Sequence, residues 1–334
     1  MGQAESAKTL KKKLRSKRQE YKRIRKEAKE KDKAERGEYK RKKKLIEQEI
    51  FRLRNEIRAA KEGRAEDEPT VTTGALPDFV IIGTMKGGTS FLYHLLSQHP
   101  LIEPAAAKEL RFFDALFDEG IEWYRQCFPA PRLKDGHRTI TGEATPGYMF
   151  VRRAPERMAR VIPQARLIAL LRNPVERAYS HYHQGVEHGL ENRTFEEAIG
   201  LQEPAEAGKA QPLGKEGENS EGEIGAKLNY HSEYLSRSVY VDQLMRCREF
   251  FPREQMLVLK SEDFFQRAHE TLKTTFDFLG LPEWEPEVSE IASKKRNAGR
   301  YEGEMDPSTR RRLEKYFEPH NRRLYEFLGK DFRW

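Results

Sequence analysis

A short segment of the sequence combines one cation, two glycines and two hydroxyl side chains. Lys86 is followed by Gly87 and Gly88, and Thr89 and Ser90 come directly after them. Glycine lets a backbone approach a ligand closely, exposed N–H groups donate to anionic oxygens, and lysine adds a mobile positive charge. This set of groups is suited to holding a phosphate or a sulfate. The alternative is an ordinary turn that binds no ligand.

The order of residues in this segment differs from that of the standard ATP-binding loop. That motif has the form G-x-x-x-x-G-K-[ST], with the lysine after the last glycine. Here Lys86 precedes both glycines. An ATP-dependent P-loop phosphotransferase is an alternative function, but the residue order of this loop does not match its motif. That alternative predicts that activity depends on Mg²⁺.

The elements on either side of the segment support an anion site. Residues 79–82 form an apolar run between turn-forming residues, which is typical of a buried strand. Residues 91–96 have the spacing of a helix with one apolar face. A strand, a glycine-containing loop and a helix start, in this order, place backbone N–H groups and a helix dipole around an anion.

A second segment has the same plan. Residues 166–171 predict another buried strand, Arg172 follows its last residue, and Pro174 suits the first turn of the next helix. Arg172 with a hydroxyl from Ser180 would hold a second phosphate, whereas Arg172 alone would be read as a surface or ion-pair residue. Because open α/β sheets bind ligands at the carboxyl ends of their strands, we expect the two sites to be neighbours.

Two further residues are candidates for chemistry. Glu143 ends a short expected strand and would lie at the same carboxyl edge, although a turn or capping carboxylate is the alternative. Lys108 lies upstream, close to the aromatic pair Phe112 and Phe113. The alternation of strands and helices predicts an α/β fold, namely a P-loop-like three-layer sandwich with a central, mostly parallel sheet, preceded by a long basic N-terminal helix.

The positive charge of the chain is concentrated at its N-terminal end. The 334 residues have a formal net charge of +8, and residues 1–68 hold 25 Lys and Arg against 14 Asp and Glu. Helix formers dominate this part, and apolar residues three and four apart predict a basic, coiled-coil-like arm. We expect a linker over 69–76 and the main domain over 77–334, with a mobile insertion at about 201–227.

The partners of the arm stay open at this stage. It can be a solvated helix, or it can contact an acidic glycan, an anionic membrane or a second copy of the chain. Gly2 and Ser6 fit the loose N-myristoylation pattern. We predict no specific binding of nucleic acid. A non-catalytic scaffold whose arm binds polyanions or membranes is a second alternative function, and it predicts that deleting residues 1–68 abolishes all function.

Cysteine usage and apolar runs bear on the compartment. Cys127 and Cys247 are too few for a disulfide framework or a four-thiolate zinc site. No apolar run reaches the ~20 residues that a membrane span needs, and the first residues have no apolar signal core. We therefore expect a cytoplasmic protein, at most peripheral at a membrane.

These motifs together resemble the nucleotide-dependent sulfotransferase family, nearest the heparan-type N- and 3-O-sulfotransferases and their bacterial relatives. The resemblance covers about Pro77 to Trp334 and leaves the arm out. It implies that residues 84–90 hold the 5′-phosphosulfate of 3′-phosphoadenylyl sulfate (PAPS), and that Arg172 and Ser180 bind its 3′-phosphate.

The resemblance also implies roles for residues outside the two phosphate segments. Glu143 aligns with the catalytic glutamate of the heparan-type enzymes, and Tyr240 matches a site residue. A basic loop before the last helix normally covers the nucleotide, and its candidates here are Lys294, Lys295 and Arg296. The following Asn-Ala-Gly-Arg departs from the heparan-type pattern. Where some relatives have a histidine on a helix, this chain has glutamine, so we assign no histidine base.

The mechanism expected from these assignments is in-line sulfuryl transfer from PAPS. Lys86 would balance negative charge on the oxygen of the leaving nucleotide, and Lys108 would bind the sulfuryl oxygens. Glu143 would take the proton from an acceptor hydroxyl or amine. We expect no metal, and the resemblance alone favours a carbohydrate acceptor.

Overall fold

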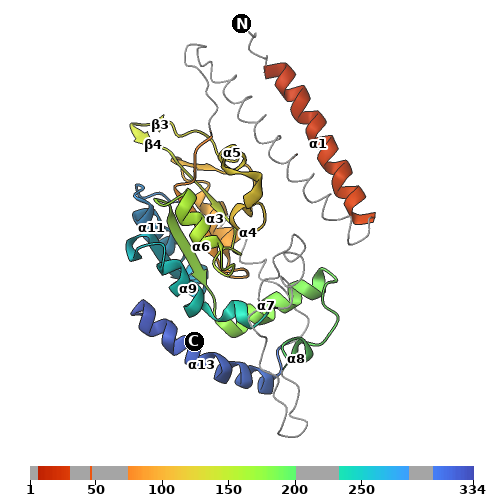
Figure 1. Cartoon of the computed structure of the whole chain (residues 1–334), viewed down its shortest axis with the longest axis vertical. Helices are drawn as coiled ribbons and strands as arrows, with labels where there is room; N and C mark the ends of the chain where they lie inside the picture. Colours follow the sequence, from red (N-terminus) through yellow and green to blue (C-terminus); the bar gives the residue numbers. More distant parts are fainter. Residues whose placement is uncertain (1–6, 31–45, 47–73, 201–232, 286–303) are drawn as a thin grey trace. The chain divides into compact units, whose positions relative to one another are not determined.

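The computed structural model describes residues 7–30, 46, 74–200, 233–285 and 304–334 (Figure 1). The described residues divide into two compact units. The first is drawn from Met1–Asp78, Pro100–Leu110 and Asp118–Glu143, and the second from Phe79–His99, Arg111–Phe117 and Ala144–Trp334.

Three parallel strands form the centre of the second unit, namely β1 (Phe79–Gly83), β6 (Arg166–Leu171) and β7 (Met256–Lys260). β6 lies between the other two and pairs in parallel with both. All residues of β1, and all but the first of β6, are buried. Burial on both faces explains why these strands are continuous apolar runs rather than alternating ones.

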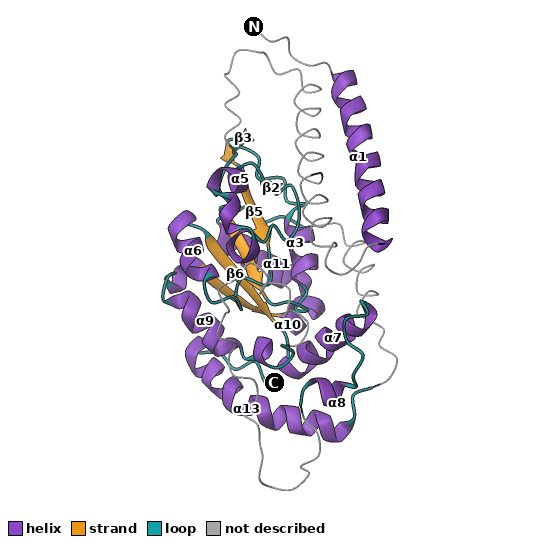
Figure 2. Cartoon of the chain, turned by 45° about the vertical axis from the view of Figure 1, so that its right-hand side comes forward, coloured by secondary structure: helices purple, strands orange, loops and turns teal. Residues whose placement is uncertain are grey.

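The helices of the second unit account for most of its remaining described residues (Figure 2). They are α3 (Thr89–Leu96), α4 (Phe112–Ala115), α6 (Ala154–Val161), α7 (Pro174–Glu187), α8 (Phe195–Ala198), α9 (Tyr240–Arg248), α10 (Ser261–Gln266), α11 (Ala268–Leu279) and α13 (Pro307–Leu328), with short 3-10 turns η3 (Ser236–Ser238) and η4 (Arg253–Gln255).

Caps and apolar packing fix the helix that matters most for the second phosphate segment. α7 begins at Pro174, and the Asn173 side chain accepts hydrogen bonds from the N–H groups of Val175 and Glu176 at 3.0 and 3.3 Å. A cap of this kind stabilises a helix by about 1 kcal/mol. The inner face of α7 joins a buried apolar cluster that also draws on α8 and α13, through residues such as Phe317.

The first unit has a smaller strand pairing. β2 (Ile102–Pro104) runs parallel to β5 (Ile140–Ala144), with Ile102 beside Ile140. The other elements of this part of the chain are α1 (Ala7–Glu30), η1 (Phe117–Glu119), α5 (Ile121–Arg125), and the antiparallel pair β3 (Leu133–Lys134) and β4 (His137–Arg138).

Only part of the basic arm is described. α1 is a helix of 24 residues on which Leu10 and Ile24 are buried and Lys11, Arg15 and Arg18 are exposed. The expected continuation of the arm, the first residues of the linker, and the insertion at 201–227 lie outside the described residues.

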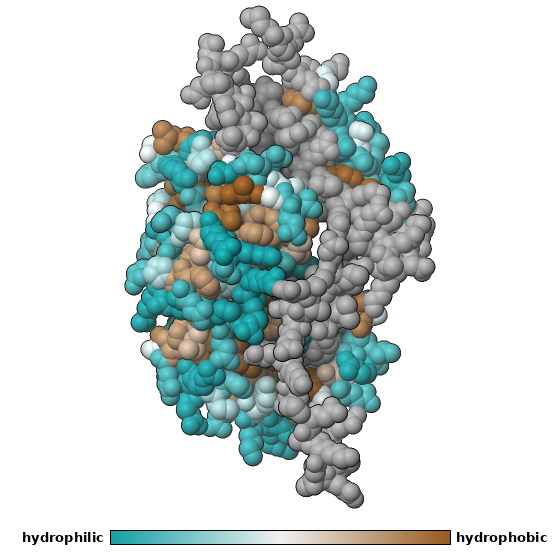
Figure 3. Space-filling model, in the orientation of Figure 1, coloured by the Kyte–Doolittle hydropathy of each residue, from teal (hydrophilic) through white to brown (hydrophobic). Residues whose placement is uncertain are grey.

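The sequence predicted the α/β class and the mostly parallel sheet correctly. The fold is α/β with a mostly parallel sheet, and the strands expected over 79–82 and 166–171 occur within one residue of those bounds. None of the helices within the described ranges is long and apolar enough to cross a bilayer. The described surface visible in Figure 3 is mainly hydrophilic, with apolar residues scattered among polar ones.

Candidate functional site

The loop after β1 is fixed to the carboxyl ends of β6 and β7. The Thr84 N–H and Oγ1 both donate to the carbonyl oxygen of Leu170 in β6, at 3.0 and 2.9 Å. The Gly87 N–H donates to the Thr84 carbonyl at 3.0 Å, which closes a tight turn. The buried Ser261 hydroxyl, directly after β7, donates to the Gly87 carbonyl at 2.7 Å. The loop therefore has a defined shape before any ligand arrives.

Two positions of the loop require glycine, for different reasons. A Cβ on Gly87 would lie 2.4 Å from the carbonyl oxygen of Leu170, which is backbone. Gly88 has a φ of +96° and caps α3, and only glycine adopts this region without strain. Lys86 also has a positive φ, +70°, which is uncommon for a residue with a side chain and is a form of strain that clusters at ligand sites.

Thr89 and Ser90 are the first two residues of α3. The first N–H groups of a helix have no acceptor within the helix, and the dipole there favours negative charge. Thr89 is buried, whereas Ser90 is exposed. The start of α3 therefore offers backbone donors and the Ser90 hydroxyl to an anion.

Lys86 and Arg172 bring two positive charges together from two strand ends. An Nη of Arg172 donates to the Lys86 carbonyl at 3.4 Å. Burial lowers the pKa of Lys86, the nearby Arg172 charge lowers this pKa further, and Glu187 raises it. Because a bound anion would relieve both the repulsion and the cost of burying the ammonium group, this electrostatic arrangement favours an anionic ligand.

The turn that holds Arg172 is fixed from two sides. The Tyr240 hydroxyl on α9 donates to the Arg172 carbonyl at 2.8 Å, and burial raises the pKa of Tyr240, so the phenol stays protonated. On the other side, Glu262 accepts a hydrogen bond from the Asn173 N–H at 2.8 Å and one from the Trp334 indole at 3.4 Å. Tyr240 therefore acts on this site through the backbone of Arg172.

In the first unit, Glu143 lies near the end of β5 and has no exposed surface. It accepts a hydrogen bond from the Tyr124 hydroxyl at 2.7 Å. Lys108 instead lies on the surface and pairs with its neighbour Glu109 at 2.7 Å. Exposed pairs of this kind contribute at most about 1 kcal/mol, so the Lys108 ammonium group is available to a ligand at little cost.

The structure places the predicted residues in three groups. The loop, Arg172 and Tyr240 are linked by hydrogen bonds in the second unit, where Ser180 is buried on α7. Glu143 and Lys108 belong to the first unit. The three basic residues expected to cover the nucleotide, Lys294, Lys295 and Arg296, lie outside the described residues.

Three supports of the candidate site were assigned no role from the sequence. Ser261 and Glu262 follow directly after β7, a strand in which only Leu259 is buried, so their position at the carboxyl edge of that strand was a usable signal. Tyr124 lies 19 residues before its partner Glu143 and in a different element, and nothing in the spacing of the sequence indicates that the two meet.

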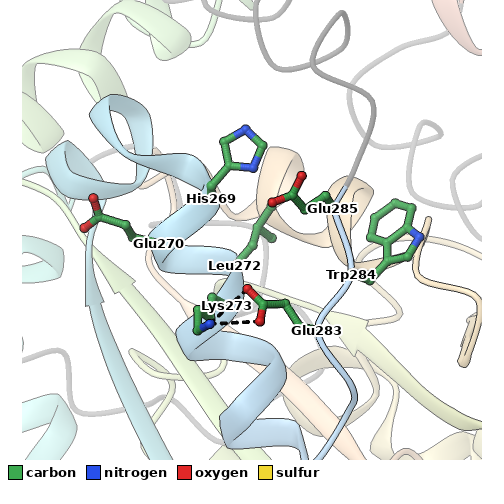
Figure 4. A pocket seen from close by; sticks show the side chains of 7 residues that line it. All are labelled: His269, Glu270, Leu272, Lys273, Glu283, Trp284 and Glu285. Atoms are coloured by element: carbon green, nitrogen blue, oxygen red, sulfur yellow. Dashed lines mark hydrogen bonds and ion pairs between the residues drawn. The ribbon is translucent and has the colours of Figure 1, made fainter.

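A separate pocket opens on α11 and the segment after it, with a volume of about 150 Å³ (Figure 4). Lys273 on α11 pairs with Glu283 across it at 2.8 Å. The residues that line the pocket are His269, Glu270, Leu272, Lys273, Glu283, Trp284 and Glu285. It shares no residue with the loop site, and its carboxylates make it a poor place for an anion.

Comparisons with known proteins show that the chain is similar to sulfotransferases. The chain is 29% identical over 319 residues to the membrane-associated sulfotransferase kil1 of Dictyostelium discoideum, covering 78% of this chain and 66% of that protein. It is 29% identical over 278 residues to the human heparan sulfate glucosamine 3-O-sulfotransferase 3B1, covering 78% and 65%. The chain therefore spans about two thirds of the length of these relatives.

A solved structure is similar over a larger share of its own length. The crystal structure of a sulfotransferase from Alicyclobacillus acidocaldarius matches with a TM-score of 0.60 and 27% identity, covering 77% of this chain and 98% of that one. Residues 76–297 match the family model of the sulfotransferase domain. This match includes the loop, Glu143, Arg172 and Tyr240, and takes in most of the chain, which therefore belongs to the sulfotransferase family.

Proposed function

We propose that this protein transfers the sulfuryl group of PAPS to a hydroxyl or amine of an acceptor, with a carbohydrate as the favoured acceptor class. The observation that carries the proposal is the loop after β1. It is fixed by hydrogen bonds to Leu170 and Ser261, it ends at a helix start, and it carries a lysine whose pKa is lowered by burial and by Arg172. These are the properties of a site for a ligand with more than one anionic group.

The residues proposed to hold the donor act through charge and hydrogen bonding. The loop N–H groups and Ser90 bind the 5′-phosphosulfate, and Arg172 and Ser180 bind the 3′-phosphate. The full proposed set is Lys86, Gly87, Gly88, Thr89, Ser90, Arg172 and Ser180, with Tyr240 acting through the Arg172 backbone and with Lys294, Lys295 and Arg296 as further predicted members. The donor supplies a sulfuryl group that carries less charge than a terminal phosphate, so the proposal includes no metal.

Lys86 stabilises the negative charge that develops on the bridging oxygen as the nucleotide leaves. The charge of a nearby ammonium group stabilises an oxyanion most strongly where water is excluded, because the local dielectric constant is low. Lys108 binds the sulfuryl oxygens in the same proposal. Because these contacts strengthen as charge develops, they lower the barrier more than they tighten binding of the donor.

Glu143 takes the proton from the acceptor as its oxygen or nitrogen attacks sulfur. A well-placed base contributes about 10²–10⁴-fold. The buried position of Glu143 and its hydrogen bond to Tyr124 support a carboxylate held in one orientation. The carbohydrate acceptor rests on the name of the human relative, a heparan sulfate glucosamine 3-O-sulfotransferase.

Residues 1–68 form an accessory arm in this proposal, and residues 77–334 form the catalytic part. The exposed cations of α1 support contact with an anionic partner, such as an acidic glycan or a membrane surface. The proposed location is the cytoplasm, at most peripheral at a membrane.

Calorimetry of the full chain with 3′,5′-bisphosphoadenosine tests donor binding. We expect saturable binding by the wild type, and binding weakened at least tenfold in Arg172→Gln, because a charge-assisted hydrogen bond is lost. No association with the correctly folded protein would contradict the proposal.

Transfer is tested with ³⁵S-labelled PAPS and a panel of glycans, amines and phenols. We expect label in a glycan, turnover that survives a metal chelator, and loss of turnover in Glu143→Gln with nucleotide binding nearly unchanged. Mg²⁺-dependent phosphate transfer from ATP would favour the phosphotransferase alternative. Full turnover in Glu143→Gln would remove Glu143 as the base.

A further inference from the structure

Tyr124 and Glu143 form a buried contact within the first unit. The phenolic oxygen lies 2.7 Å from Glu143 Oε1, and neither residue has exposed surface. A separation of this length is that of a well-formed O–H···O hydrogen bond, in which the phenol donates to the carboxyl oxygen. Because burial excludes water as a competing partner, the tyrosine strongly influences the state and the direction of the carboxylate.

The tyrosine is itself held by its surroundings. It belongs to α5, and its ring meets the edge of the Phe128 ring, with centroids 4.9 Å apart and planes at 85°. Its backbone N–H donates to the Gly120 carbonyl at 3.3 Å, and its carbonyl accepts from the Cys127 N–H at 3.0 Å. The direction of the hydroxyl is therefore set by the fold.

We propose that Tyr124 is a positioning residue for sulfuryl transfer, which acts by holding the Glu143 carboxylate in its ionised form and in one plane. The inference rests on the proposed function, in which Glu143 accepts the proton of the acceptor. A hydrogen bond to the charged form of a carboxyl group favours that form. A base that is aimed before the acceptor binds also avoids the cost of reorientation during the reaction.

Tyr124→Phe tests the proposal, because it keeps the ring and its contact with Phe128 and removes only the donor. We expect kcat to fall about ten- to hundredfold, the effect of losing one hydrogen bond to a charged group. The KM values for donor and acceptor, and the affinity for 3′,5′-bisphosphoadenosine, should change less than twofold. Tyr182→Phe is the matched control, since Tyr182 donates to the Arg193 carbonyl at an exposed site. It should leave kcat unchanged.

A double-variant comparison separates positioning from general support of the fold. If Tyr124 acts through Glu143, adding Tyr124→Phe to Glu143→Gln should lower kcat no further, because the group that it positions is already lost. A full additional loss in the double variant would overturn the inference. Wild-type kcat in Tyr124→Phe would overturn it as well.

A second substitution tests the same inference in case the Tyr124→Phe variant does not fold. Phe128→Leu removes the ring edge that aims the tyrosine while the hydroxyl stays, and it should lower kcat several-fold without changing KM; an unchanged kcat would count against the inference. The proposed function fails separately, since it requires Glu143→Gln to lose turnover. Loss of turnover in Glu143→Gln with full turnover in folded Tyr124→Phe would remove the inference alone.

Discussion

Replacing Gly87 by alanine adds one methyl group at the most confined point of the loop. The new Cβ would lie 2.4 Å from the Leu170 carbonyl oxygen and 2.7 Å from Thr84 Oγ1, where ordinary contact begins at 3.4 Å. The two backbones must therefore separate by about 1 Å, or β6 must give way by the same amount. Overpacking of this kind costs about 1–3 kcal/mol, which corresponds to a melting temperature about 2–12 °C lower in a domain of this size.

The displacement should also break the donor site. A shift of about 1 Å misaligns the loop N–H groups, and each charge-assisted hydrogen bond that is lost weakens binding about ten- to hundredfold. We expect the affinity for 3′,5′-bisphosphoadenosine, measured by calorimetry, to fall at least tenfold.

Gly200→Ala is the control for lost stability alone. Gly200 has a φ of +69°, and a Cβ there would meet no atom of the described residues within 4 Å, so the cost is backbone strain of about 1–2 kcal/mol. This variant should melt at a lower temperature and bind the nucleotide normally. Wild-type melting and wild-type affinity in Gly87→Ala would refute the reasoning about the loop.

Three further substitutions test the charges and supports around the loop. Lys86→Ala should reduce kcat more than it raises the acceptor KM, as steady-state kinetics would show, and a change confined to KM would argue against a role in the transition state. The Glu187 charge raises the pKa of Lys86, so Glu187→Gln should lower this pKa and move the alkaline limb of the pH profile of kcat/KM to lower pH. If the limb does not move, it does not report the ionisation of Lys86. Ser261→Ala leaves the Gly87 carbonyl without its 2.7 Å donor. It should lower the free energy of unfolding by about 1–3 kcal/mol, as measured by denaturant titration. An unchanged free energy of unfolding in this variant would contradict a stabilising role for the hydrogen bond.

The elements that carry local signals were predictable from the sequence. The apolar runs and the glycines gave the strands and the loop, because burial on both faces of a parallel strand and backbone approach at a turn each impose residue types locally. The place of Arg172 followed from its position after a strand. Its hydrogen bond to the Lys86 carbonyl then depends only on two neighbouring parallel strands ending at one edge.

Contacts between distant elements were not predictable in the same way. Tyr124 and Glu143 meet because α5 and β5 pack within one unit, and no local pattern records that packing. The positive φ of Lys86 was equally unpredictable from the sequence, since a lysine residue gives no indication of such a backbone conformation. The supports Ser261 and Glu262 lie between these cases, because their place after β7 was visible and their partners were not.

The proximity of Lys86 and Arg172 has a practical consequence for handling the protein. Simple oxyanions in the buffer, such as phosphate or sulfate, will compete for the same pair of cations and will mask weak ligands. A ligand present at 100 times its Kd raises the free energy of unfolding by about 2.7 kcal/mol. Thermal shift screens in chloride-based buffers should therefore rank nucleotides by how many anionic groups they present to this pair.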